Sequence, residues 1–435
     1  MNAPTSPASK FRITAPSDLR FVRGLAWLGL VLGGLFVIGL GVAPTFFGGG
    51  YFVAAAIVTV VVIFPFVSRR MLSSSWQRIG VHYVALATIL TYLAIDDFRI
   101  RRPQTLEEFA PALPGDEKSY EVLMRYGKNH PLGHDFRFQP PQSLYRGKGV
   151  WNPSDAEWKN WLLSNRADIE KDWKQLDPVR TWWAELDTFD RIGDLTPPKV
   201  DAEIMAFGPV RAYTQHACAI ASLQAIDGQG DAALETLIPV FEVGRKLTPS
   251  SRTLVRSMVA IIVQKMTMET ANFILNTTEV SPAVRSHFAA ALGDTTNDET
   301  NVRRLIGIEY VWAEEVWFRM GIGDIANSML VGEGKAPGWC RRIINPLTPF
   351  VCNPRRSINL YGDLAADLAD LAAQRKIKQL DQRSTEFARH EAHPRFKNLG
   401  GTYAITAAVP AYSKVVEAFW KTSDLRSALR SRLKA

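Results

Sequence analysis

A run of 20 residues without a charged side chain, from Gly24 to Ala43, constrains this chain more than any other feature. A helix that crosses the hydrocarbon core of a bilayer needs about 20 predominantly apolar residues. Arg20 and Arg23 directly precede the run. We therefore expect a membrane-spanning helix over residues 24–43. This anchor determines where the rest of the chain lies.

Two further apolar runs follow the first one. Residues 51–67 carry no charge and come after a short loop of proline and glycine residues. Residues 79–95 form a run of 17 residues, at the lower limit for spanning, and contain His82 and two tyrosines that suit a membrane interface. The sequence favours a third span here, and the alternative is a buried helix of the soluble part. The expected anchor covers residues 20–95, behind a polar tail over 1–19 that we expect to be disordered and cytoplasmic.

The charge of the chain is divided unevenly. Residues 1–95 carry seven basic side chains and one acidic one, so that only +2 of the net charge of +8 falls on the remainder. Basic residues beside hydrophobic segments set topology, and they place both ends of the first helical pair in the cytoplasm. If residues 79–95 span, residues 96–435 lie outside. We expect a bacterial inner-membrane protein with a periplasmic soluble domain and, given the balanced charge of that domain, no nucleic-acid partner.

The soluble part shows helical periodicity. Prolines and tryptophans break residues 96–208 into short helices and loops, although Ser154 and Glu157 have the spacing of a capping box. Residues 209–320 read as helices in series, with a hairpin that turns at 227–230, a helix from Thr248-Pro249 and another from Ser281-Pro282. No alternating strand series occurs. We expect an all-α fold: transmembrane helices followed by stacked αα-hairpins.

The C-terminal third contains a break and then further helices. Residues 321–356 are rich in glycine and proline and contain Cys340 and Cys352. Helices are expected over 357–435, the first of them from about Ser357 to Ala388. Residues 228–234 with 244–247, and residues 353–361, resemble uncharacterised bacterial proteins with N-terminal membrane segments and a helical extracytoplasmic domain. This resemblance implies the architecture and no activity.

Two groups of residues are candidates for a metal site. Glu386, His390 and His393 fall at i, i+4 and i+7, and a carboxylate with two imidazoles is a common ligand set. Pro394 and the flanking arginines favour a solvated helix end instead. His130 and His134 form the second group, but the proline and glycine between them argue against helical ligand spacing. We favour neither site, and we expect no cofactor.

Half of the 12 tryptophans lie within a short segment, and they are candidates for a binding surface: Trp151, Trp158, Trp161, Trp173, Trp182 and Trp183. Exposed indoles mark surfaces that bind a partner, a glycan or the membrane interface. Bulky aromatic residues more often belong to a core, which we favour.

The three cysteines predict one disulfide at most. Cys340 and Cys352 lie 12 positions apart with two prolines between them, and in an oxidising compartment they could form a bridge. Cys218 lies on an apolar helix, where we expect it buried and reduced. His216 is two positions away, which puts the two side chains on different sides of that helix and excludes a Cys–His nucleophile pair.

The sequence contains none of the common catalytic motifs, so we lean against an enzyme. Stacked helical hairpins present extended surfaces, which favours a membrane-anchored binding or scaffold protein of the cell envelope with a protein partner. The alternatives are a metal-dependent hydrolase that uses the histidines and a cell-envelope glycan binder that uses the tryptophans.

Overall fold

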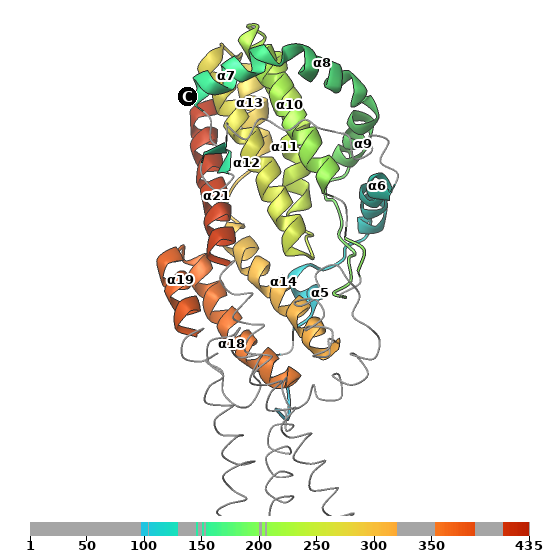
Figure 1. Ribbon diagram of the computed structural model, residues 1–435, viewed down its shortest axis with the longest axis vertical. Helices are drawn as coiled ribbons and strands as arrows, with labels where there is room; N and C mark the ends of the chain where they lie inside the picture. The colour runs from blue at the N-terminus through green and yellow to red at the C-terminus, as the bar shows by residue number, and fades with distance from the viewer. Residues whose placement is uncertain are drawn as a thin grey trace, which may run out of the picture.

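The computed structural model describes residues 97–102, 104–128, 145–146, 150–151, 154–199, 202–204, 207–319, 353–387 and 412–434. This part of the chain is all-α, as the periodicity predicted (Figure 1). One exception is a two-residue antiparallel pair, β1 (Tyr145–Arg146) with β2 (Val150–Trp151). Residues 1–96 lie outside the described residues, so the three membrane spans stay predictions.

The helices follow one another along the chain with short connections. The first half contains α5 (Leu106–Phe109), α6 (Asp116–Lys128), α7 (Asp155–Ser164), α8 (Arg166–Gln175), α9 (Asp177–Asp187), α10 (Gly208–Ile226) and α11 (Gly230–Leu247). The second half contains α12 (Leu254–Thr277), α13 (Pro282–Leu292), α14 (Asp298–Arg319), α18 (Pro354–Ala373), α19 (Ile377–Glu386) and α21 (Tyr412–Lys434).

Two helix starts are set by local caps, as the sequence indicated. Ser154 and Glu157 form the predicted capping box: the Ser154 hydroxyl accepts from the Glu157 amide, and the Glu157 carboxylate accepts from the Ser154 amide at 2.8 Å. Helix α13 begins at Pro282, with the Ser281 hydroxyl as its cap. A cap satisfies amides that have no partner within the helix, which is why both starts can be read locally.

Helices α10, α11 and α12 pack against one another at the centre of the upper group in Figure 1. Gly228 makes the tight turn between α10 and α11, with φ of +80°. Helix α12 is long and apolar enough to cross a membrane by length and composition, but it contacts α10, α11 and α21, and more than half of its most apolar stretch is buried. It is therefore a core helix of this bundle.

A second group, formed by α14, α18 and α19, lies below the first (Figure 1). Helix α14 packs along α18, and Tyr310 stacks near Tyr361 with ring centroids 6.0 Å apart. The C-terminal helix α21 runs beside both groups and contacts α12, α13, α14 and α19. The last helix therefore connects the two groups of helices.

Three predicted boundaries are wrong. Helix α12 begins at Leu254, with Thr253 as its cap, because long-range contacts described below hold residues 248–252 in a turn between α11 and α12. Helix α18 begins at Pro354, within the segment expected to be a loop up to 356. The single helix expected from about 357 to 388 is divided into α18 and α19 at Arg375, which has φ of +57°.

Candidate functional site

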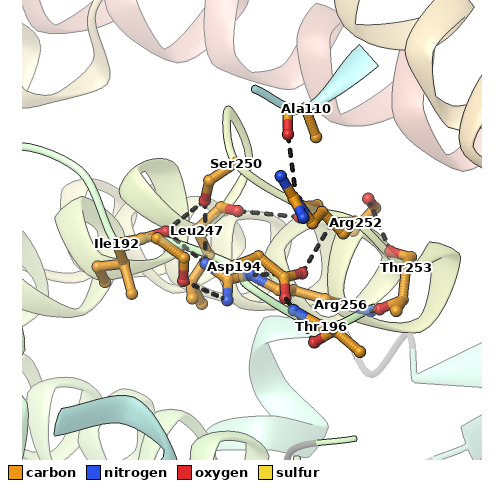
Figure 2. A network of polar contacts seen from close by, with 12 residues as sticks. Ala110, Ile192, Asp194, Thr196, Leu247, Ser250, Arg252, Thr253 and Arg256 are labelled. Atoms are coloured by element: carbon orange, nitrogen blue, oxygen red, sulfur yellow. Dashed lines mark hydrogen bonds and ion pairs between the residues drawn. The ribbon is translucent and has the colours of Figure 1, made fainter. Parts of the chain in front are cut away.

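A buried ion pair between Asp194 and Arg256 lies within a network of polar contacts that joins several helices (Figure 2). The two side chains are 1% and 2% exposed, and Arg256 Nε lies 3.7 Å from Asp194 Oδ2. Arg256 comes from the first turn of α12, whereas Asp194 comes from the loop after α9. Burial of a charged pair costs desolvation energy, so this pair needs further hydrogen bonds to be stable.

Backbone carbonyls of the loop supply those bonds to Arg256. Arg256 Nη1 donates to the Gly193 carbonyl at 2.8 Å, and Nη2 donates to the Ile192 carbonyl and to Ser250 Oγ. The Ser250 hydroxyl itself donates to the Ile192 carbonyl. The hydroxyl proton is therefore committed to a carbonyl oxygen, and none of the described residues accepts it as a base, so the contacts seen here do not activate Ser250 as a nucleophile.

The carboxylate of Asp194 is held from two directions. Oδ1 accepts from the amide and the hydroxyl of Thr196, at 3.0 and 2.6 Å, which closes a local turn. Oδ2 accepts from the Arg252 amide at 2.7 Å, which brings in the turn before α12. Three hydrogen bonds and the ion pair with Arg256 therefore hold this carboxylate in one position.

Arg252 extends the network to α5 and α14. Its Nε donates to the Ala110 carbonyl at 3.2 Å, and its Nη2 donates to Glu107 Oε1 at 3.1 Å. Trp312 on α14 donates its indole N–H to the Arg252 carbonyl at 2.6 Å. One residue of the α11–α12 turn thus ties together two segments that are far apart in the sequence.

The start of α6 packs against the loop that follows α9. Arg191 lies 3.3 Å from Asp116 Oδ2, and the Ser119 hydroxyl accepts from the Gly193 amide at 2.8 Å. A Cβ atom built on Gly193 would lie 2.4 Å from the Cβ of Asp116. This approach leaves no room for a side chain, so the position requires glycine.

Arg304 on α14 is the third buried arginine of this region, after Arg252 and Arg256, and it has no carboxylate partner among the described residues. Its guanidinium donates to the carbonyls of Thr248 and Pro249. Burial, followed by repulsion from Arg191 and Arg256, lowers the pKa of Arg304 to about 10. Burial likewise lowers the pKa of Arg256, although Asp194 opposes the shift.

We call the side chains of Glu107, Asp116, Arg191, Asp194, Ser250, Arg252, Arg256 and Arg304 the arginine network. It contains no cysteine, histidine or lysine. Its charged groups contact backbone carbonyls, backbone amides, the Thr196 hydroxyl and one another. Such an arrangement fixes backbone segments relative to one another. It acts as a structural hub.

The tryptophan segment contributes mainly to the core. Trp158, Trp182 and Trp183 are buried, so these three candidates for a binding surface belong to the core, which is the interpretation that the sequence favoured. The Trp182 and Trp183 indoles donate to the carbonyls of Val122 and Pro239, at 2.9 and 3.0 Å. Trp161 and Trp173 are half-buried, and each packs against another aromatic ring. The side chain of Trp151 is not among those that the structure describes.

The other predicted site residues are not brought together. Glu386 is exposed at the end of α19 and accepts from Gln382 at 2.7 Å. Its proposed partners His390 and His393 lie outside the described residues, as do His130, His134, Cys340 and Cys352. Within the described ranges, no group of three or more His, Cys, Asp or Glu side chains could hold a metal ion.

Cys218 is buried, as predicted, and it is a free cysteine. Burial raises the pKa of its thiol to about 12, which makes it a poor nucleophile. His216 is also buried; its Nδ1 lies 2.8 Å from the Ala212 carbonyl, and burial lowers its pKa. Both side chains therefore pack in the helix bundle and form no catalytic pair.

The arginine network was not found from the sequence. A usable signal existed, because Ser250 to Thr253 form a polar run with one arginine, and Arg256 follows at the start of an otherwise apolar helix. Charges at the start of a core helix indicate buried partners. Those partners lie 58 to 145 positions away, so the sequence could not identify them.

No family model, no curated protein and no solved structure matches this chain.

Proposed function

We propose that this chain is a membrane-anchored binding or scaffold protein of the bacterial cell envelope, whose helical domain presents a rigid surface to a protein partner. The observation that carries the proposal is the arginine network. It joins α5, α6, the loop after α9, the α11–α12 turn and α14, and its buried charges are used to hold these segments. Buried polar contacts that hold the helices in fixed positions suit a protein that binds a partner better than one that catalyses a reaction.

The anchor in this proposal is the N-terminal part of the chain. Residues 24–43, 51–67 and 79–95 have a length and an apolar composition that suit spanning helices. Basic residues on the proposed cytoplasmic side orient the anchor. With three spans the helical domain faces the periplasm of the inner membrane.

The partner in this proposal is a protein. The domain carries a nearly balanced charge, which offers no electrostatic footprint for nucleic acid. Rigid helical surfaces bind proteins with little reorganisation, which limits the entropic cost of association.

Affinity purification tests the proposal directly. The full chain with a C-terminal tag would be cross-linked in cells, solubilised in detergent and purified from the membrane fraction. We expect one envelope protein to co-purify in stoichiometric amount with and without the cross-linker, and not with a tagged control membrane protein of the same topology. Recovery of the chain alone under both conditions would contradict a scaffold role.

A further inference from the structure

A cavity of about 180 Å³ lies between the end of α11, the middle of α12, the start of α14 and the helix α21. It is distinct from the arginine network, although Thr248 and Pro249 border both. None of the tryptophans considered as a binding surface lines it. The inference drawn from this cavity concerns a small ligand and does not depend on the proposed scaffold role.

The charges at the cavity cancel. Arg426 Nη2 lies 2.6 Å from both carboxylate oxygens of Asp298, and Arg245 Nε donates to Glu242 at 3.0 Å. Asp294 adds a second carboxylate to the lining. Two acidic and two basic side chains therefore line the space, so it favours a neutral ligand over an anion or a cation.

Three carboxamide side chains at the cavity have hydrogen-bonding capacity that the described residues do not use. Asn297 and Asn301 make no side-chain hydrogen bond to any described residue, and both line the cavity. Gln264 Nε2 donates to the Gly244 carbonyl and to Thr248 Oγ1, at 3.2 and 3.0 Å, which leaves Oε1 available as an acceptor. Gln264 is buried, Asn301 is half-buried and Asn297 is exposed. Water can satisfy the outer amides, and a hydroxylated ligand can replace that water with hydrogen bonds of the same kind.

Hydroxyl groups and an apolar wall complete the lining. The Thr422 and Ser423 hydroxyls donate to the Ala418 carbonyl and the Asp298 carboxylate, and each hydroxyl oxygen keeps acceptor capacity. Phe419 and Ile261, both buried, supply apolar surface. The lining thus combines hydrogen-bond donors and acceptors with one aromatic ring. This combination suits a molecule that has hydroxyl groups around its edge and C–H groups on its face.

We infer that this cavity binds a small neutral polyhydroxylated molecule, a polyol or a single sugar residue. The volume is consistent with this class, because a cavity of about 150 Å³ accommodates a six-membered ring. A side-chain amide can donate a hydrogen bond to a hydroxyl or accept one from it, since it has two N–H donors and a carbonyl acceptor. The competing outcome is a cavity that holds water only.

Ligand titration of the full chain tests the inference. The protein would be purified in a detergent without a sugar headgroup, because alkyl glycosides would compete for the site. Glycerol, myo-inositol, glucose and N-acetylglucosamine would be added separately while thermal unfolding and saturation-transfer NMR are recorded. We expect at least one of them to give a saturable shift of the melting temperature, with a Kd of about 1 mM or tighter.

Variants assign the binding to the cavity. Asn301→Leu fills part of the space and removes an unpaired amide, and we expect it to weaken binding about tenfold or more without lowering the melting temperature of the free protein. Asn160→Leu on the exposed face of α7 is the matched control and should bind as the original chain does. If Asn301→Leu fails to fold, Asn297→Ala at the exposed rim replaces it.

Three outcomes would overturn the inference. The first is no saturable binding of any of the four compounds by the folded original chain, which leaves the cavity to water. The second is unchanged affinity in the folded Asn301 or Asn297 variant, which places binding elsewhere. The third is binding of glucuronate or glucose 6-phosphate with no binding of the neutral compounds, which contradicts the neutral class.

Discussion

Arg426 near the C-terminus holds Asp298 at the start of α14 through a charge-assisted contact, with Nη2 2.6 Å from each carboxylate oxygen. Ser423 donates to the same carboxylate, so α21 makes two polar contacts with this one side chain. Both charged side chains are largely buried. The last helix of the chain is therefore fixed to the middle of the sequence by a buried ion pair, in addition to apolar packing.

Removal of Arg426 should destabilise the domain. Arg426→Leu leaves the Asp298 carboxylate buried without its counter-charge, and such changes typically cost about 3–5 kcal/mol. The free energy of unfolding would be measured by urea titration with circular dichroism. Arg303→Leu is the control, since Arg303 pairs with the exposed Asp370, and exposed pairs contribute at most about 1 kcal/mol. Similar losses in both variants would show that the buried pair has no special role.

Asp194→Asn should be far more damaging than the same change at Asp294. Both residues form the same local turn with a threonine two positions on: Asp194 with Thr196 and Asp294 with Thr296. Asp194 also faces the buried Arg256, so its loss should cost about 3–5 kcal/mol. Asp294 is fully exposed, and its change should leave the unfolding midpoint in urea nearly unaltered. Equal midpoints for the two variants would contradict a stabilising network.

The buried thiol of Cys218 predicts a pH dependence. Its pKa is raised from 9.0 to about 12 in the folded protein, so the unfolded chain loses this proton first. The stabilisation is complete below pH 9 and is lost as the pH rises towards 12. In Cys218→Ala, the free energy of unfolding should fall less steeply between pH 9 and 11 than in the original chain. Parallel curves for the two proteins would mean that the thiol titrates normally.

Thiol counting tests the predicted bridge between Cys340 and Cys352. In a periplasmic domain these two cysteines should be oxidised and Cys218 reduced. Denatured, unreduced protein should therefore show one reactive thiol, and the same protein after reduction should show three. Three reactive thiols before reduction would reject the bridge and favour a cytoplasmic domain. Alkaline phosphatase fused after Ala435 would report the compartment independently, with activity expected.

Local signals allowed part of the fold to be predicted. The caps at Ser154 and Ser281 involve residues within three positions, so the starts of α7 and α13 follow from the sequence alone. The all-α class follows from apolar periodicity, which depends on spacing along one helix. Burial of Cys218 follows from the same pattern.

Long-range contacts explain what could not be predicted. Residues 248–252 were expected to be helical, but Ser250 and Arg252 bond to Ile192, Asp194 and Ala110, and these contacts delay the helix to Leu254. The division between α18 and α19 at Arg375 also involves a contact with a residue far away in the sequence. The guanidinium of Arg375 lies over the ring of Trp420, with its Cζ 3.9 Å from the ring centroid, and no local pattern signals that partner. The cavity beside α21 likewise forms only when four distant segments meet.

The arginine network also determines the smallest part of this chain that can fold alone. Its hydrogen bonds reach from Glu107 to Trp312, and Arg426 extends the buried polar contacts almost to the C-terminus. Any cut between these points would leave buried charges or carbonyls of one fragment without the groups that satisfy them. We therefore expect the helical domain to unfold as one unit, and fragments designed for crystallography or for split reporters should retain all of residues 107–426.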